Sequence, residues 1–212
     1  MINIIPPFTP NNKPLFAFIV DAPSFDDGRN HLSQQQKGKV GWPLYGAAGR
    51  RFTQLASNVN ISRWENYVGY VFPEIRTNKL ENICVGKDQQ WEDINYISGG
   101  GQPPFPIPPL HLSNLLYLVK HPIAIGKYIP QSHWHYIIKL WHQLNNLEWE
   151  QNGIKLPILV PMGNVALWAI CGKLGIDKAR GAQTDSLILR TDNTPFNVFP
   201  TFHPQFTLYA EK

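Results

Sequence analysis

Short apolar runs alternate along this chain with longer stretches in which apolar residues recur at helical spacing. The apolar runs have the length of strands and cover 15–20, 67–72, 156–161 and 197–199. Helical spacing is found over 47–58, 112–121, 132–149 and 165–175, and we expect Gly175 to close the last of these helices. Strands alternating with helices predict an α/β fold, a three-layer α/β/α sandwich with a mostly parallel central sheet.

The length of 212 residues suits a single domain spanning 1–212. Residues 1–14 are punctuated by prolines and are expected to form an N-terminal arm. Residues 98–110, SGGGQPPFPIPPL, are expected to be a surface loop, because their glycines and prolines disfavour regular structure. The sequence shows neither a signal peptide nor a membrane-length apolar segment, so we expect a cytoplasmic monomer with no membrane partner.

Composition narrows the functional classes only slightly. The 19 Lys and Arg outnumber the 15 Asp and Glu, and a net charge of +4 favours a polyanionic partner. Seven Trp and 12% aromatic residues exceed the usual need of a core, so we expect some rings to face a ligand. Cys84 and Cys171 fit reduced thiols better than a disulfide framework, and the spacing of His133, His135 and His142 does not suit a zinc site, so no metal is expected.

Polar residues suited to catalysis or ligand binding follow the predicted strands. Asp21 comes directly after the run 15–20, Asn164 follows 156–161, and His203 follows 197–199 between prolines. Because the carboxyl ends of parallel strands share one edge of a sheet, these side chains are expected to meet there. Asp26 and Asp27 add carboxylates close behind Asp21.

Two other kinds of chemistry have weaker support. The glycines of 41–50 could form an ordinary turn or let the backbone approach a phosphate or a base, but no Walker motif follows them, which disfavours nucleotide hydrolysis. Ser24 with His203 and an Asp would make a hydrolase triad, but Ser24 lacks the GxSxG context of a nucleophile elbow.

Taken together, these motifs resemble the uracil-DNA glycosylase superfamily, and most closely its bacterial and archaeal family-four branch. The family's Gly-Glu-Ala-Pro-Gly turn is matched by Asp21-Ala22-Pro23-Ser24 within 20–27, and its Gly-x-Pro-Phe-x-Gly-x-Ala-Gly-Arg turn is matched by 41–50. The final Thr-x-His-Pro-Ser turn looks like 201–205. The similarity keeps this order over most of 15–208.

The resemblance implies an enzyme that flips a base out of DNA and hydrolyses its N-glycosidic bond to leave an abasic site. Asp21 then takes the acidic role, with Asp26 and Asp27 in reserve, and His203 donates a hydrogen bond to the departing base. A carboxylate stabilises the oxocarbenium-like sugar while a donor stabilises the leaving base. The implied base pocket comprises Ala22, Pro23, Ser24, Leu44, Tyr45 and Tyr70. The implied DNA contacts are Gly46, Arg50, Arg51, Asn164, Arg180 and Gln205.

Departures from the family pattern bear on the substrate and the cofactor. Two cysteines cannot hold the family-four iron-sulfur cluster, so no cofactor is expected. Leu44 replaces the Phe that stacks on uracil, Tyr70 lies near the place of the uracil-reading Asn, and the segment 28–40 adds polar residues expected near the pocket. These changes favour a modified base, such as a bulky modified pyrimidine of phage DNA, and hence an antiviral role.

Three alternatives stay open at this stage. The first is a uracil-DNA glycosylase that acts in base-excision repair. The second is a nucleic-acid-binding relative without catalytic activity, whose DNA affinity would fall with salt whatever the base. The third is a hydrolase of free nucleosides, which would not need a DNA strand.

Overall fold

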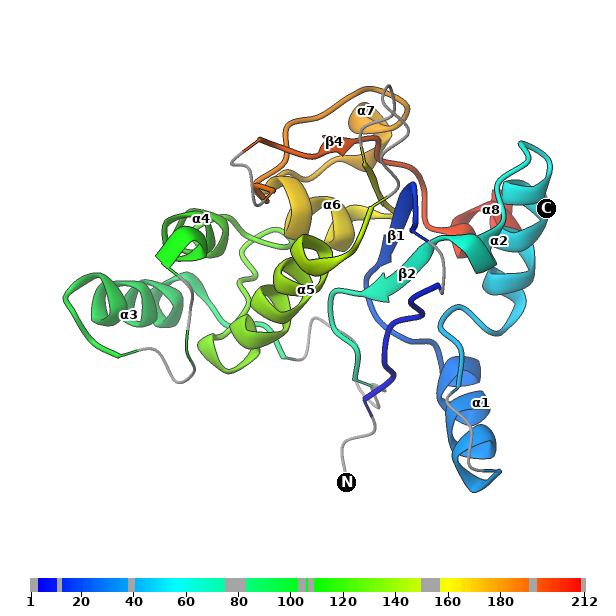
Figure 1. Cartoon of the computed structure of the whole chain (residues 1–212). Coiled ribbons are helices and arrows are strands. Elements are labelled where there is room, and N and C mark those ends of the chain that lie inside the picture. The colour runs from blue at the N-terminus through cyan, green and yellow to red at the C-terminus, as the bar shows by residue number, and fades with distance from the viewer. Residues whose placement is uncertain are drawn as a thin grey trace.

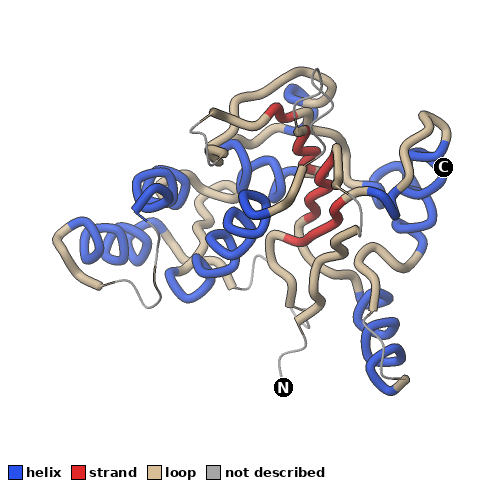
Figure 2. The backbone as a smooth tube through the Cα atoms, viewed as in Figure 1, coloured by secondary structure: helices blue, strands red, loops and turns tan. Residues whose placement is uncertain are grey.

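The protein has an α/β fold built on a parallel sheet. The computed structural model describes residues 4–10, 13–37, 41–74, 83–102, 106, 109–149, 157–190 and 194–210. In these ranges the sheet has the strand order β2-β1-β3-β4, and every neighbouring pair is parallel. The strands are β1 (Phe16–Val20), β2 (Tyr67–Tyr70), β3 (Ile158–Pro161) and β4 (Asn197–Val198). Figure 2 shows them at the centre, with helices on either side.

Helices form the two outer layers. Figure 1 shows α5 and α6 on one side of the sheet, with α3 and α4 beyond them, and α2 and α8 together on the other side. The α-helices are α1 (Phe25–Gln36), α2 (Ala47–Ser57), α3 (Lys87–Ser98), α4 (Pro109–Val119), α5 (Trp134–Asn146), α6 (Asn164–Cys171), α7 (Ile176–Ala179) and α8 (Pro204–Ala210), and the short 3₁₀ turns are η1 (Arg63–Glu65) and η3 (Gln131–His133). The predicted α/β sandwich with a parallel sheet is confirmed.

The two faces of β1 belong to two separate apolar clusters. Ala17 and Ile19 pack with the residues of α4, α5 and α6, whereas Phe18 and Val20 pack with Phe52 of α2. A strand covered on both faces needs apolar residues at every position, which explains the continuous run in the sequence. The sheet is thereby held between its helix layers.

The N-terminal arm packs along the edge of the sheet. Ile5 is fully buried and donates its backbone N–H to the Pro73 carbonyl oxygen. Phe8 and Val68 exchange backbone hydrogen bonds in an antiparallel bridge. In the described part of residues 1–14, the arm therefore covers the otherwise open side of β2.

Several helix predictions were wrong in extent or missing. The largely polar residues Phe25–Gln36 form α1, which was not predicted, and neither α3 nor α8 has a strong apolar stripe to reveal it in the sequence. The helix expected to end at Gly175 ends at Gly172, whose φ of 66° suits glycine, and Gly175 instead precedes α7. The helix predicted over 132–149 begins as η3 and ends at Asn146. The loop predicted over 98–110 is irregular at 99–102 but gives way to α4 at Pro109, and part of it lies outside the described residues.

Within the described ranges, every helix is too short or too polar to cross a membrane. Cys84 and Cys171 are not joined in a disulfide. Burial raises the pKa of Cys171 to about 12, and the nearby Lys173 only partly opposes this. Cys171 is therefore an inert part of the core rather than a reactive thiol.

Candidate functional site

A cavity of ≈ 590 Å³ lies at the carboxyl end of β1. Its walls come from the turn after β1, the beginnings of α1 and α2, and α8. The lining residues are Asp21, Ala22, Pro23, Ser24, Asp26, Asp27, Leu44, Gly46, Ala47, Ala48, Gly49, Phe72, His203, Gln205, Leu208 and Tyr209. The segments singled out in the sequence around 21–27, 41–50 and 201–205 thus meet at one hollow.

Asp21 and His203 approach each other at this cavity. The Nε2 atom of His203 lies 3.5 Å from Oδ1 of Asp21, and their side chains are 22% and 47% exposed, respectively. This separation is longer than an ordinary N–H···O hydrogen bond, so Nε2 is not committed to Asp21. A ligand in the cavity can therefore reach both groups.

The second ring nitrogen of His203 has a backbone partner. The N–H of Gln205 donates to Nδ1 of His203 over 3.1 Å. A nitrogen that accepts a hydrogen bond carries no proton, so the neutral imidazole holds its proton on Nε2. His203 thus presents an N–H donor toward Asp21 and the cavity.

The backbone around His203 is fastened to the end of β3. Thr201 donates its N–H to the Pro161 carbonyl oxygen and accepts a hydrogen bond from the N–H of Gly163. Pro204 then begins α8, and proline is favoured at the first position of a helix because its missing N–H is not needed there. His203 is held between a strand end and a helix start.

Asp27 has a structural role that its sequence position did not reveal. It is 2% exposed and forms a capping box with Ser24, in which the Ser24 backbone N–H and hydroxyl both donate to Oδ2. Oδ2 also accepts a hydrogen bond from the Tyr70 hydroxyl at 3.0 Å, and Oδ1 accepts one from the Tyr45 N–H. Since its oxygens are already engaged, Asp27 is a positioning residue rather than a free acid.

Tyr70 ties this acid to the glycine-rich turn. Its hydroxyl donates to Asp27 and accepts a hydrogen bond from the Leu44 N–H at 2.7 Å. Burial, reinforced by the negative charge of Asp27, raises the pKa of Tyr70 well above its ordinary value. Tyr70 therefore stays protonated and links the turn after β1 to the turn before α2.

Asp26 is exposed and lies against Gly46 at the N-terminus of α2. A Cβ added to Gly46 would stand only 2.5 Å from Oδ2 of Asp26. A carboxylate is favoured beside a helix N-terminus, which explains this position without a catalytic role. Of the three acids predicted from the sequence, Asp21 has the most suitable placement next to His203.

The predicted base pocket divides into two groups. Ala22, Pro23, Ser24 and Leu44 line the cavity, whereas Tyr45 and Tyr70 are not among its lining residues. Phe72, which lies just beyond the end of β2, lines the cavity instead of Tyr70, and the two side chains pack in different apolar clusters.

The sequence reasoning missed Phe72 together with Leu208 and Tyr209. Phe72 directly precedes the proline that ends the 67–72 run, and this position at a strand end was a usable signal. Leu208 and Tyr209 reach the cavity from α8, a helix that the apolar pattern did not predict.

The predicted DNA contacts are spread over a wider surface. Gly46 and Gln205 line the cavity. Arg50 lines a neighbouring hollow, and Arg51 contacts Gln54 of its own helix. Asn164 and Arg180 lie elsewhere: the Asn164 side chain accepts the N–H groups of Gly175 and Ile176, and the Arg180 guanidinium lies 4.5 Å from the Phe202 ring centroid.

The polar segment 28–40, described as far as residue 37, does not extend the pocket over its described part as the sequence predicted. Its described residues continue α1, and none of residues 28–37 lines the cavity. Figure 1 shows α1 projecting from the body of the protein, below α2 in this view. Only the first turn of α1 belongs to the site.

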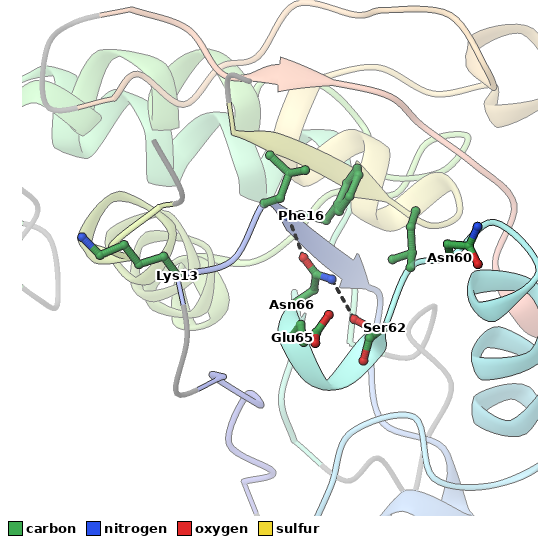
Figure 3. Close-up of a pocket in the computed structure, with 8 residues that line it drawn as sticks. Lys13, Phe16, Asn60, Ser62, Glu65 and Asn66 are labelled. Atoms are coloured by element: carbon green, nitrogen blue, oxygen red, sulfur yellow. Dashed lines mark hydrogen bonds between the residues drawn. The ribbon is translucent and has the colours of Figure 1, made fainter. Parts of the chain in front are cut away.

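A further pocket of ≈ 400 Å³ lies near the amino ends of β1 and β3 (Figure 3). In this view Asn66 spans the space between β1 and η1, where its Oδ1 accepts the Phe16 N–H and its Nδ2 donates to the Ser62 carbonyl oxygen. The polar groups of Asn66 therefore satisfy the backbone. The pocket at the opposite end of the strands, with Asp21 and His203, is the better candidate for chemistry.

Neither protein-family models nor curated proteins gave a match to this chain. The glycosylase resemblance therefore stays a prediction that rests on the three motifs. Among the described residues, no group of three or more His, Cys, Asp or Glu side chains is placed to hold a metal ion.

Proposed function

We propose that this protein is a DNA glycosylase that receives a flipped nucleotide in the cavity and hydrolyses its N-glycosidic bond, leaving an abasic site. The observation that carries the proposal is the approach of Asp21 to His203 at the mouth of a hollow of ≈ 590 Å³. A volume in the range of about 300–1,000 Å³ is typical of small-molecule sites. One acid and one N–H donor are the groups this reaction needs.

Asp21 stabilises the positive charge that develops on the sugar. As the bond from C1′ to the base nitrogen breaks, both bonding electrons leave with the base, and the sugar acquires oxocarbenium character. Asp21, Asp26 and Asp27 line the cavity, and its described lining residues include no Lys or Arg, so its field favours a cation. A water molecule then bonds to C1′, and Asp21 accepts the proton it releases.

His203 stabilises the departing base. Because Gln205 occupies Nδ1, the N–H at Nε2 is available to a base oxygen or nitrogen on which negative charge accumulates. The base leaves as an anion paired with this donor and takes up a proton from solvent on release.

The apolar walls favour a base other than plain uracil. Leu44 stands where the resembling family has a stacking Phe, and the buried ring of Phe72 supplies the aromatic surface. Exposed Gln205 and Tyr209 add polar groups to the lining, where a substituent on a pyrimidine would emerge. A modified pyrimidine, such as one in phage DNA, is the proposed substrate.

The proposal is tested by mass spectrometry of the bases released from three DNAs: unmodified, uracil-containing, and phage-derived with modified pyrimidines. Wild type should release a single modified base, and Asp21→Ala and His203→Ala should release little or none. Release of uracil alone would reassign the protein to uracil repair. Release from free nucleosides but not from DNA would make it a nucleoside hydrolase, and silence on every substrate would end the glycosylase proposal.

A further inference from the structure

A second hollow, of ≈ 370 Å³, lies behind the glycine-rich turn. It shares Leu44 and Gly49 with the cavity of Asp21 and His203, so one turn forms a wall of both. Its lining residues are Trp42, Leu44, Tyr45, Gly49, Arg50, Thr53, Arg63 and Trp64. We call Trp42, Tyr45 and Trp64, which border this hollow, the aromatic groove.

The rings of the aromatic groove are unusually exposed. Trp42 and Tyr45 are both 50% exposed, and Trp64 is 44% exposed. The centroids of Trp42 and Trp64 are 4.7 Å apart with an angle of 62° between the ring planes, which leaves ring surface uncovered beside their edge contact. Three large solvent-exposed rings around one hollow indicate a surface that binds a flat partner.

The charges at this groove are positive. Arg63 is 6% exposed, its guanidinium carbon lies 4.7 Å from the Trp64 ring centroid, and its Nη atoms donate to the Pro43 and Leu44 carbonyl oxygens. Arg50 lines the same hollow from the exposed face of α2. Neither Asp nor Glu is among the lining residues that the structure describes, so a partner with negative charge is favoured.

We infer that the aromatic groove binds an unpaired nucleobase next to the flipped nucleotide, which makes single-stranded DNA the preferred substrate. Exposed aromatic rings combined with basic residues are the usual platform for single strands, because every base has a flat face for stacking and the backbone phosphates attract exposed basic side chains such as that of Arg50. The shared wall of Leu44 and Gly49 places the groove directly beside the reaction cavity. This inference rests on the proposed glycosylase function.

A base within a duplex has both faces covered by its neighbours and cannot stack on these rings without leaving the helix. An unpaired strand has no such cost. An apolar peptide would use the rings but not the positive charge of Arg50, so a nucleic acid explains both features of the groove.

The experiment measures equilibrium binding by fluorescence anisotropy, with a labelled oligothymidylate as probe and the matching duplex as competitor. Asp21→Ala is used as the background so that turnover does not consume any probe. Trp42→Ala and Trp64→Ala should each weaken single-strand binding about 5-fold to 100-fold, the usual effect of removing one stacked base contact. Trp91→Ala, on α3 and 38% exposed, is the matched control and should bind like the background protein.

A scan of abasic positions identifies the contact directly. In oligonucleotides that carry one non-cleavable target nucleotide, the flanking bases are replaced one at a time by an abasic spacer. Removing the base at one flanking position should weaken binding by the same factor as Trp42→Ala does. Combining this abasic spacer with Trp42→Ala should weaken binding little further, because both changes remove the same contact. Trp42→Phe, which keeps a ring, should recover part of the binding and shows that the Ala variant failed by losing the ring rather than the fold.

Equal binding by Trp42→Ala, Trp64→Ala and Trp91→Ala would overturn the inference, as would tighter binding of the duplex than of the single strand. If neither groove variant affected base release, the glycosylase proposal would stand, but the aromatic groove would not be part of its substrate site. If the groove variants lost binding but the wild-type protein released no base from any DNA, the single-strand binding site would be supported and the glycosylase proposal would be wrong.

Discussion

The Nε2 atom of His203 lies 3.5 Å from Oδ1 of Asp21, although the two residues are at opposite ends of the chain. If they act on the same transition state, their contributions cannot be independent. Asp21→Asn and His203→Gln should each lower the single-turnover rate of base release about 100-fold to 10,000-fold. The double variant should lose much less than the product of the two losses, because the remaining catalysis no longer uses either group. Asp177→Asn, on the exposed side of α7, is the control and should keep the wild-type rate. Fully multiplicative losses would mean that the residues act separately.

Tyr70→Phe removes the hydroxyl that joins Asp27 to Leu44. The variant leaves a buried carboxylate oxygen and a backbone N–H each short of one partner, which should lower the free energy of unfolding by about 1–3 kcal/mol. Urea denaturation monitored by circular dichroism measures this loss. Tyr96→Phe, at a site 59% exposed, should leave the unfolding midpoint unchanged. A midpoint for Tyr70→Phe equal to that of Tyr96→Phe would show that the network is not needed for stability.

Gly49→Ala should disrupt the turn that forms both hollows. The added Cβ would stand 1.4 Å from the Leu44 carbonyl oxygen, and Leu44 already has a φ of 53°, so backbone rather than a flexible side chain must move. We expect a loss of about 3 kcal/mol in the free energy of unfolding. Gly86→Ala, where nothing lies within 4 Å of the new Cβ, should cost at most about 1 kcal/mol. Similar thermal midpoints for the two variants would contradict this account.

His111 should make the stability depend on pH. Burial, helped by the charge of His142, lowers the pKa of His111 below its ordinary value of 6.5. Between the lowered pKa and 6.5 the unfolded chain binds a proton that the folded chain does not, so stability falls as the pH decreases through this window. In His111→Gln the dependence should be weaker than in wild type, while His121→Gln should follow the wild-type curve. Parallel curves of the free energy of unfolding against pH for wild type and His111→Gln would exclude this contribution.

The sequence predicts the sheet better than the helices around it. The strands could be predicted because they are buried on both faces, and the runs 15–20 and 67–72 carry no polar interruption. By contrast, α1 reads as a polar loop because it projects from the body of the protein and buries little apolar surface. Its existence depends on the capping box of Ser24 and Asp27, a signal that was present in the sequence but was interpreted as chemistry.

The candidate site, like the fold, was only partly predictable from the sequence. Asp21 and His203 were predictable because Asp21 comes directly after β1 and His203 comes in the turn that follows β4, and parallel strands bring such positions together. The difference between Asp21 and Asp27 was not predictable from spacing, since it depends on Tyr70 and Tyr45 reaching Asp27 from elsewhere in the chain. That Phe72 rather than Tyr70 lines the cavity depends on the bend after β2, which places the two side chains in different apolar clusters.

The register of the sheet also has a consequence for how the protein reaches its native state. Phe18 pairs with Val68 on one side and with Val160 on the other, so the innermost strand is completed by a segment from the far part of the chain. During synthesis, one edge of β1 stays unpaired until β3 has been translated. Such long-range closure slows folding and exposes apolar surface in the meantime. We therefore expect fragments that stop before Ile158 to aggregate rather than fold, and chaperone dependence to be greatest before that point of translation.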